Sequence, residues 1–160
     1  MLIVVLASIL AGCGGGGNAT WQEIRGNGFR FDAPAGWSAS GTAASDGEVD
    51  RVEVVPYRLV RPYARARRTA TFRELDGVVA RLATQMKGTV TSRSSLDLEA
   101  RPQGRDARAY TIAYDGKIEE ITFVLDARRE YELLCRRQAG GDDSACRRLV
   151  SSFRLAPFLA

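Results

Sequence analysis

Hydrophobic and polar side chains alternate along several stretches of this chain. Phe29 and Phe31 alternate with Arg30 and Asp32, and a period of two is typical of a strand with one buried face. Similar patterns, or runs rich in β-branched residues, predict further strands over residues 49–56, 89–98, 108–114, 117–125 and 130–136. The chain is therefore predicted to form about six strands.

A hairpin signal joins two of these strands. Asp115-Gly116 lies between them, and this dipeptide favours a two-residue turn between antiparallel strands. In that register Tyr110 faces Ile121, and Phe123 and Leu125 extend the same apolar face. Ser38 to Glu48, in contrast, is small and polar and is predicted to be a surface loop.

One long segment and one short segment have helical spacing. The long one opens with Thr71 to Glu74, which matches a capping box, and ends before Gly88, which suits a left-handed C-cap. Its apolar stripe consists of Phe72, Leu75, Val79, Leu82 and Met86. The short one follows Asp142 or Asp143 as a cap and places Cys146, Leu149 and Val150 on one face. We expect both helices to cover the sheet.

The apolar run Leu2 to Leu10 leads into Leu10-Ala11-Gly12-Cys13. This motif resembles a bacterial lipobox, in which the cysteine sulfur receives a diacylglycerol and the signal peptide is cut off before it. The resemblance implies a signal peptide over residues 1–12, a lipidated Cys13 carrying fatty acids such as palmitate, and a membrane-anchored domain on the extracytoplasmic face. Residues 14–20 are rich in glycine and would form a short, flexible linker.

Two other interpretations of this segment fit less well. A buried N-terminal strand or helix would have to continue into four glycines, Gly14 to Gly17, which is costly. A transmembrane helix needs roughly 20 apolar residues, and the run is much shorter. Because signal peptides begin with positive charge and none precedes Leu2, we expect the true start to lie upstream of Met1.

Motifs at both ends of the remaining chain carry a second resemblance. The segment from Gly28 to Trp37 contains a strand and a P-x-G-W turn, and the C-terminal part contains a Gly116-Lys117 hairpin, a Y-x-L-x-C strand and a terminal SF-R-L segment. Together they resemble the PsbP-like family, including small bacterial lipoproteins of the LpqN type. The resemblance implies one domain over residues 21–160. Its fold would be an α/β (α+β) sandwich, an antiparallel sheet of about six strands covered by one long and one short helix.

Composition limits the chemistry that this domain could perform. The chain has no histidine, which excludes histidine-dependent nucleophile pairs and histidine-ligated zinc. Glu119 and Glu120 are adjacent on a predicted strand and should point to opposite faces, so they cannot act on one substrate atom. Asp142 and Asp143 are expected to cap a helix, not to bind metal. We therefore predict a protein that is not an enzyme and has no cofactor or metal.

The most basic stretch lies between the second predicted strand and the long helix. Its arginines are interleaved with Tyr57 and Tyr63, and such a segment could bind phosphate groups of an anionic lipid or envelope polymer. They are Arg58, Arg61, Arg65, Arg67 and Arg68. The alternative is a solvated basic loop, since nearly all 23 basic residues of the chain are arginine and its net charge is only +4. Nucleic acid is not expected as a partner, because an extracytoplasmic domain would not meet it.

Two cysteines remain after Cys13. Cys135 ends a predicted strand and Cys146 begins the short helix, with Gly140-Gly141 in the loop between them. Export permits oxidation, so we predict a disulfide between them. The alternatives are two separately buried thiols or, less plausibly, a metal pair, whose coordination two thiolates alone would leave incomplete.

The function implied by the PsbP-like resemblance is that of a non-catalytic binding or scaffold module in the cell envelope. Its partners would be the membrane, through the lipid on Cys13, and an envelope protein or anionic polymer. An alternative is a carrier or sensor of a small apolar ligand held between sheet and helix.

Overall fold

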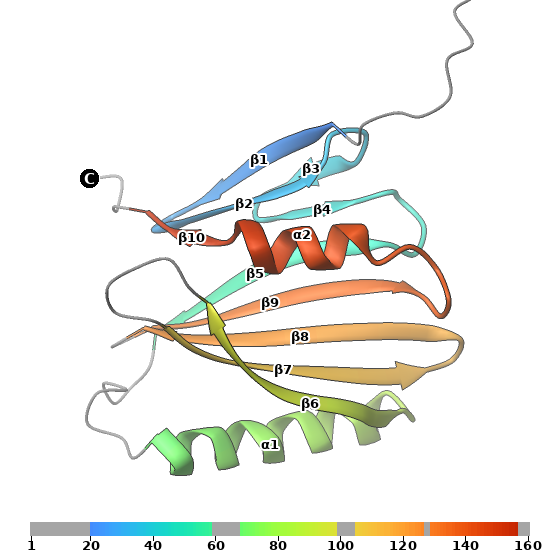
Figure 1. Cartoon of the computed structure of the whole chain (residues 1–160). Coiled ribbons are helices and arrows are strands. Elements are labelled where there is room, and N and C mark those ends of the chain that lie inside the picture. Colours follow the sequence, from blue (N-terminus) through green and yellow to red (C-terminus); the bar gives the residue numbers. More distant parts are fainter. Residues whose placement is uncertain (1–19, 59–67, 99–104, 127–128, 157–160) are drawn as a thin grey trace, which may run out of the picture.

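The structure is a computed structural model that describes residues 20–58, 68–98, 105–126 and 129–156. Its larger sheet has seven strands in the order β3-β4-β5-β9-β8-β7-β6 (Figure 1). Their bounds are Ser38–Ser40 (β3), Ala43–Ser45 (β4), Arg51–Arg58 (β5), Thr89–Leu98 (β6), Arg105–Tyr114 (β7), Lys117–Asp126 (β8) and Arg129–Gln138 (β9). Every neighbouring pair in it is antiparallel.

A smaller sheet and a helix cover one face of the larger sheet. The small sheet consists of β1 (Trp21–Gly26), β2 (Phe29–Pro34) and β10 (Arg154–Leu155), with β2 in the middle. Helix α2 (Ser144–Ser152) packs against β2, β9 and β5. Their shared core includes Phe29 and Phe31 of β2, Tyr131 of β9, Leu149 of α2 and Phe153. The aromatic rings meet in this core, where the Phe29 ring centroid is 5.7 Å from that of Tyr131 and 6.1 Å from that of Phe153.

Helix α1 (Arg68–Gln85) covers part of the opposite face. It runs along the edge of the sheet beside β6 and contacts β6 and β7 (Figure 1). Leu75, Val79 and Ala83 of α1 pack with buried residues of β7 and β8, including Tyr110 and Ile121. The apolar stripe predicted from the sequence is therefore the face that meets the sheet. Among the described residues, neither helix combines the length and apolar character that a membrane crossing requires.

The hairpin between β7 and β8 confirms the sequence prediction. Tyr110 lies opposite Ile121, as expected from the Asp115-Gly116 turn. Asp115 and Gly116 both have positive φ, 44° and 69°, and two positive φ angles in a two-residue turn match the twist of antiparallel strands. The α+β class with two helices is confirmed as well.

The expectation of about six strands is wrong. The structure has a seven-stranded and a three-stranded sheet. Part of the difference comes from Ser38 to Glu48, where β3 and β4 form in place of the predicted loop. These strands are only three residues long, so their few small side chains carry no visible alternation.

The ends of α1 also differ from the prediction. The helix begins at Arg68, so Thr71 lies within its first turn and is not the N-cap. At the other end Lys87, not Gly88, has positive φ. Gly88 is needed for a different reason, because a Cβ there would lie 2.7 Å from the Ala113 carbonyl oxygen and 2.8 Å from Tyr114 Cβ.

Candidate functional site

Side chains of β5, β8 and β9 form a mostly acidic surface on the face of the large sheet that α1 covers elsewhere. Tyr57 of β5 lies opposite Glu130 of β9, and Glu132 lies two residues further along β9 on the same face. We call this surface the acidic strip, and it consists of Glu53, Tyr57, Glu119, Glu130 and Glu132. Tyr57 is 47% exposed, one of the two large hydrophobic residues left exposed in the described chain.

Charge is not balanced within the acidic strip. Glu53 pairs with Arg51 at 2.8 Å, and Glu119 pairs with Arg136 at 2.8 Å. Among the described residues, neither Glu130 nor Glu132 has a cationic partner. Burial raises the pKa of Glu130, and the charge of Glu132 raises it further. A positively charged neighbour would therefore stabilise the ionised form of these carboxylates.

The pKa of Glu132 is raised for related reasons. Burial is the main cause, and the charges of Glu119 and Glu53 add to it, while a hydrogen bond from Tyr57 acts in the opposite direction. Burial and the nearby glutamates also raise the pKa of the Tyr57 hydroxyl, so that it stays protonated and able to donate. The strip thus combines a neutral donor, an exposed aromatic ring and partly exposed carboxylates.

Replacing Glu132 with glutamine is expected to stabilise the protein at pH 8 but to have little effect at pH 4. The folded-state pKa is above the unfolded one, so ionisation destabilises the fold. This destabilisation is absent at low pH, grows as the pH rises through the unfolded value, and is complete above the folded value. Urea unfolding at both pH values, with the exposed Glu74→Gln as a control, measures it. Equal stabilisation at both pH values would contradict the assignment.

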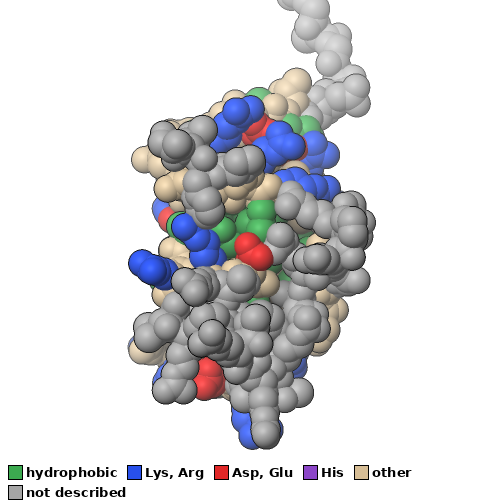
Figure 2. Space-filling model, turned by 90° about the vertical axis from the view of Figure 1, so that its left-hand side faces the viewer, with side chains coloured by type: hydrophobic (Ala, Val, Ile, Leu, Met, Phe, Trp, Pro, Cys, Tyr) green, Lys and Arg blue, Asp and Glu red, His purple; other side chains and the backbone are tan. Residues whose placement is uncertain are grey.

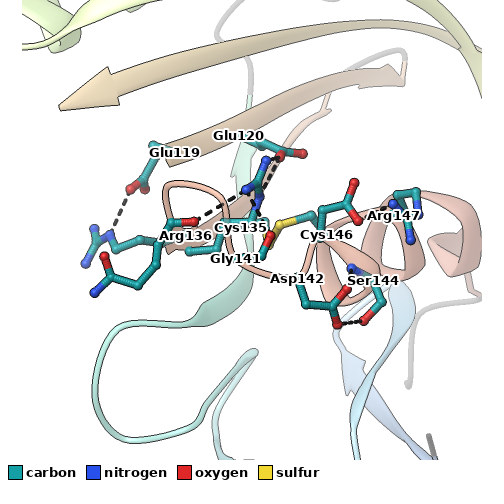
Figure 3. Close-up of a disulfide and its surroundings, with 12 residues drawn as sticks. Glu119, Glu120, Cys135, Arg136, Gly141, Asp142, Ser144, Cys146 and Arg147 are labelled. Atoms are coloured by element: carbon teal, nitrogen blue, oxygen red, sulfur yellow. Dashed lines mark hydrogen bonds and ion pairs between the residues drawn. A yellow bond between two sulfur atoms is a disulfide. The ribbon is translucent and has the colours of Figure 1, made fainter. Parts of the chain in front are cut away.

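Glu119 and Glu120 serve different faces of the sheet, as predicted. Glu119 is buried and accepts hydrogen bonds from Tyr114 (3.0 Å) and Arg136 (2.8 Å), both on the same carboxylate oxygen. Glu120 instead accepts one from Arg137 (3.1 Å). Figure 3 shows the two carboxylates directed toward these separate partners. The two carboxylates are therefore not arranged as an acid–base pair.

Cys135 and Cys146 lie at disulfide distance, as the sequence predicted. Their sulfurs are 2.08 Å apart and their Cα atoms 5.3 Å apart, which ties β9 to α2 (Figure 3). Arg137 supports the same loop, because its guanidinium also reaches the carbonyl oxygens of Gln138 and Gly141 at 3.4 Å. The disulfide is buried in the core that the small sheet, α2, β5 and β9 share, which we call the α2-side core.

Asp142 and Asp143 lie at the start of α2, but the side chain at the N-cap position does not make the predicted capping hydrogen bond. Asp143 occupies the N-cap position but makes no side-chain capping hydrogen bond, and it pairs instead with Arg147. Asp142 accepts the Ser144 backbone N–H at 3.1 Å and also the Ser144 hydroxyl. Hydrogen bonds from Ser144 lower the pKa of the Asp142 carboxyl. Within the described residues, no group of three or more metal-ligating side chains comes together.

Most of the predicted basic patch lies outside the described residues. Arg58 is exposed at the end of β5, and Arg68 begins α1. Arg61, Arg65 and Arg67 lie outside the described ranges, as do the predicted signal peptide and Cys13. The end of the molecule where β5 finishes faces the viewer in Figure 2, and acidic, basic and hydrophobic side chains all reach its surface.

The acidic strip is not predicted from the sequence. A period-two signal is present in parts of each strand alone. Glu53 lies between the buried Val52 and Val54 on β5, and Glu130 and Glu132 lie on either side of the buried Tyr131 on β9. The two sets become one surface only through the β5–β9 pairing. That pairing joins segments far apart in the sequence.

The fold was compared with solved structures. The solution structure of cyanobacterial PsbP (CyanoP) from Synechocystis sp. PCC 6803 matches with a TM-score of 0.57, covering 92% of this chain and 99% of that chain. The fold is PsbP-like. Sequence identity in this match is 16%, so the PsbP-like likeness concerns the architecture alone.

Other comparisons add little to the PsbP-like match. A structure from Bacteroides thetaiotaomicron matches with a TM-score of 0.31 and 9% identity, covering 85% of this chain and 42% of that chain, which is too weak to carry an argument. No protein-family profile matches the sequence, and no curated protein matches it.

Proposed function

We propose that this protein is a lipid-anchored module of the cell envelope that binds a partner without catalysis, similar to the LpqN-type lipoproteins. Three features support the proposal. The lipobox-like motif at Leu10 to Cys13 provides an anchor, the glycine-rich linker gives the domain reach, and the Cys135–Cys146 pair suits an oxidising compartment.

The acidic strip is the observation that carries the binding function. It brings an exposed tyrosine beside carboxylates that lack cationic partners among the described residues. Aromatic residues are enriched at protein interfaces, and complementary charge guides association. A protein partner with a basic surface fits this strip best. An anionic polymer would bind the arginine-rich segment instead, because it would be repelled by the carboxylates of the acidic strip.

The anchor is tested by Cys13→Ala. The variant is expected to leave the membrane fraction or to accumulate unprocessed, because no sulfur remains to receive the lipid. Detergent partitioning and the mass of the mature protein measure this, and Cys146→Ala is the control that removes a cysteine without touching the motif. Partitioning of Cys13→Ala that equals wild type would refute the anchor.

The binding surface is tested by photo-crosslinking in intact cells. A photoreactive phenylalanine at Tyr57 is expected to give a discrete crosslinked protein, and the same residue at Val78 is not. Val78 is a matched control, because it is 42% exposed against 47% for Tyr57 but lies on α1. If Glu130→Lys abolishes the crosslink from position 57, the negative charge of the acidic strip contributes to partner binding. Identical products from both positions, or none from Tyr57, would argue against this surface.

The alternative of a small apolar ligand between sheet and helix has no specific support among the described residues. Side chains of α1 pack directly against those of β7 and β8, including Val79 against the cluster that holds Ile112. A carrier or sensor of a small apolar ligand therefore stays the alternative prediction.

A further inference from the structure

A second charged cluster lies where α1 packs against β7 and the edge strand β6. Asp76 of α1 faces two guanidinium groups, Arg93 on β6 and Arg108 on β7. Tyr110 lies opposite Arg93 in the register of these strands and donates a hydrogen bond of 2.5 Å to Asp76 Oδ1. Four side chains from three elements therefore meet on one face of the sheet.

The single carboxylate does not satisfy the two arginines. Arg93 Nη1 is 3.3 Å from Asp76 Oδ2, and Arg108 Nε is 3.6 Å from Asp76 Oδ1. Charge-assisted hydrogen bonds between such groups are typically about 2.7–2.9 Å. Arg108 Nε is buried and has no hydrogen-bond acceptor among the described residues. Buried donors normally have partners, so Asp76 leaves part of the hydrogen-bonding capacity of Arg108 unused.

Aromatic rings hold both guanidinium groups in place. Arg108 lies over the Phe72 ring at 5.4 Å from its centroid, and Arg93 lies over the Tyr110 ring at 5.9 Å. Stacking on a ring leaves the N–H edges of a guanidinium free to bind an anion. Phe72 and Asp76 are one turn apart on α1, so both can contact Arg108 from the same face of the helix.

The cluster has a net positive charge. Burial and the hydrogen bond to Asp76 raise the pKa of the Tyr110 hydroxyl, which therefore stays neutral. One carboxylate then faces two cations. Ser95 adds another donor, because it lies opposite Arg108 and so projects from the same face. The Arg93 side chain is 48% exposed and that of Arg108 is 22% exposed, so solvent reaches both.

We propose that Arg93 and Arg108, with Ser95, form a binding site for a phosphate group. Planar guanidinium groups match the oxygens of phosphate, and two of them can hold it from different sides. Asp76 positions the arginines in the absence of the anion and limits the affinity by repulsion. The site is independent of the lipid anchor and of the acidic strip, which lies on β5, β8 and β9.

The test uses the full chain with Cys13→Ala, so that no attached lipid contributes. Calorimetric titration with inorganic phosphate is expected to show binding that weakens at least tenfold in Arg93→Gln and in Arg108→Gln. Arg30→Gln is the matched control, because it removes the same charge from a side chain that is 50% exposed and pairs with Glu23 on the other sheet. Asp76→Asn is expected to tighten binding several-fold, since it removes the competing charge.

Vesicles distinguish the source of the phosphate group. Stronger binding to phosphatidylglycerol than to phosphatidylcholine vesicles, lost in Arg93→Gln, would indicate a lipid headgroup, and binding of inorganic phosphate alone would indicate a soluble ligand. The comparison between vesicles is the readout, because the apolar N-terminal segment would bind both. If Arg108→Gln fails to fold, the phosphate affinity of the more exposed Arg93→Gln variant tests the proposal. Absence of binding to either probe, or an equal loss in Arg30→Gln, would overturn the proposal.

Discussion

Phe29→Ala is expected to lower the free energy of unfolding by about 3–5 kcal/mol. Phe29 is 1% exposed, and its ring contacts those of Phe31, Tyr131 and Phe153. Truncation would remove buried apolar surface and leave a cavity where the small sheet meets the large one. Because β2 and β9 contribute rings to the same cluster, the neighbours cannot easily collapse into that space.

Urea unfolding of purified protein measures this change, and Tyr57→Ala provides the control. Both variants truncate an aromatic residue in a strand, but Tyr57 is 47% exposed and should lose much less stability. A loss for Phe29→Ala that is no greater than for Tyr57→Ala would contradict the described core.

Removing the disulfide is expected to lower the free energy of unfolding by about 2–3 kcal/mol, according to the chain-entropy model. Cys135 and Cys146 are separated by 11 residues, so the bridge closes a short loop in the unfolded chain. Both side chains are buried in the α2-side core. Cys146→Ala, measured by thermal and urea unfolding, should lower stability by this amount plus a small packing loss.

Reduction separates the bridge from the packing of the sulfur atoms. Wild-type protein should lose most of the same stability in reductant, whereas a Cys135→Ala/Cys146→Ala variant should not respond. If reductant leaves the wild-type stability unchanged, or mass spectrometry of the oxidised protein finds two alkylatable thiols, the bridge does not contribute as described.

The sequence predicted best those elements that local residue composition or turn residues specify. Strand β6 was predicted with its observed bounds, Thr89–Leu98, and the β7–β8 hairpin with its register. The turn residues Asp115 and Gly116 fix that register locally, so no distant contact is needed. The C-terminal cysteine pair was likewise predictable, because its partners are close in the sequence.

Other elements depend on contacts that local patterns do not record. β1 has Ile24 as its one fully buried residue, and it is defined by its pairing with β2. The beginning of α1 before Thr71 carries no recognisable cap. The acidic strip and the Arg93–Arg108 site each combine residues from three elements, and only the folded arrangement brings them together.

The pairing of β5 with β9 has a consequence for how the chain folds. These central strands come from distant parts of the sequence, and Arg154 of β10 pairs back to Arg30 of β2. Contacts between distant segments require large loops to close first, which slows folding. The α2-side core can therefore form only after nearly the whole chain is present. A chain interrupted before β9 would leave Val52 and Val54 of β5 without the strand and helix that bury them.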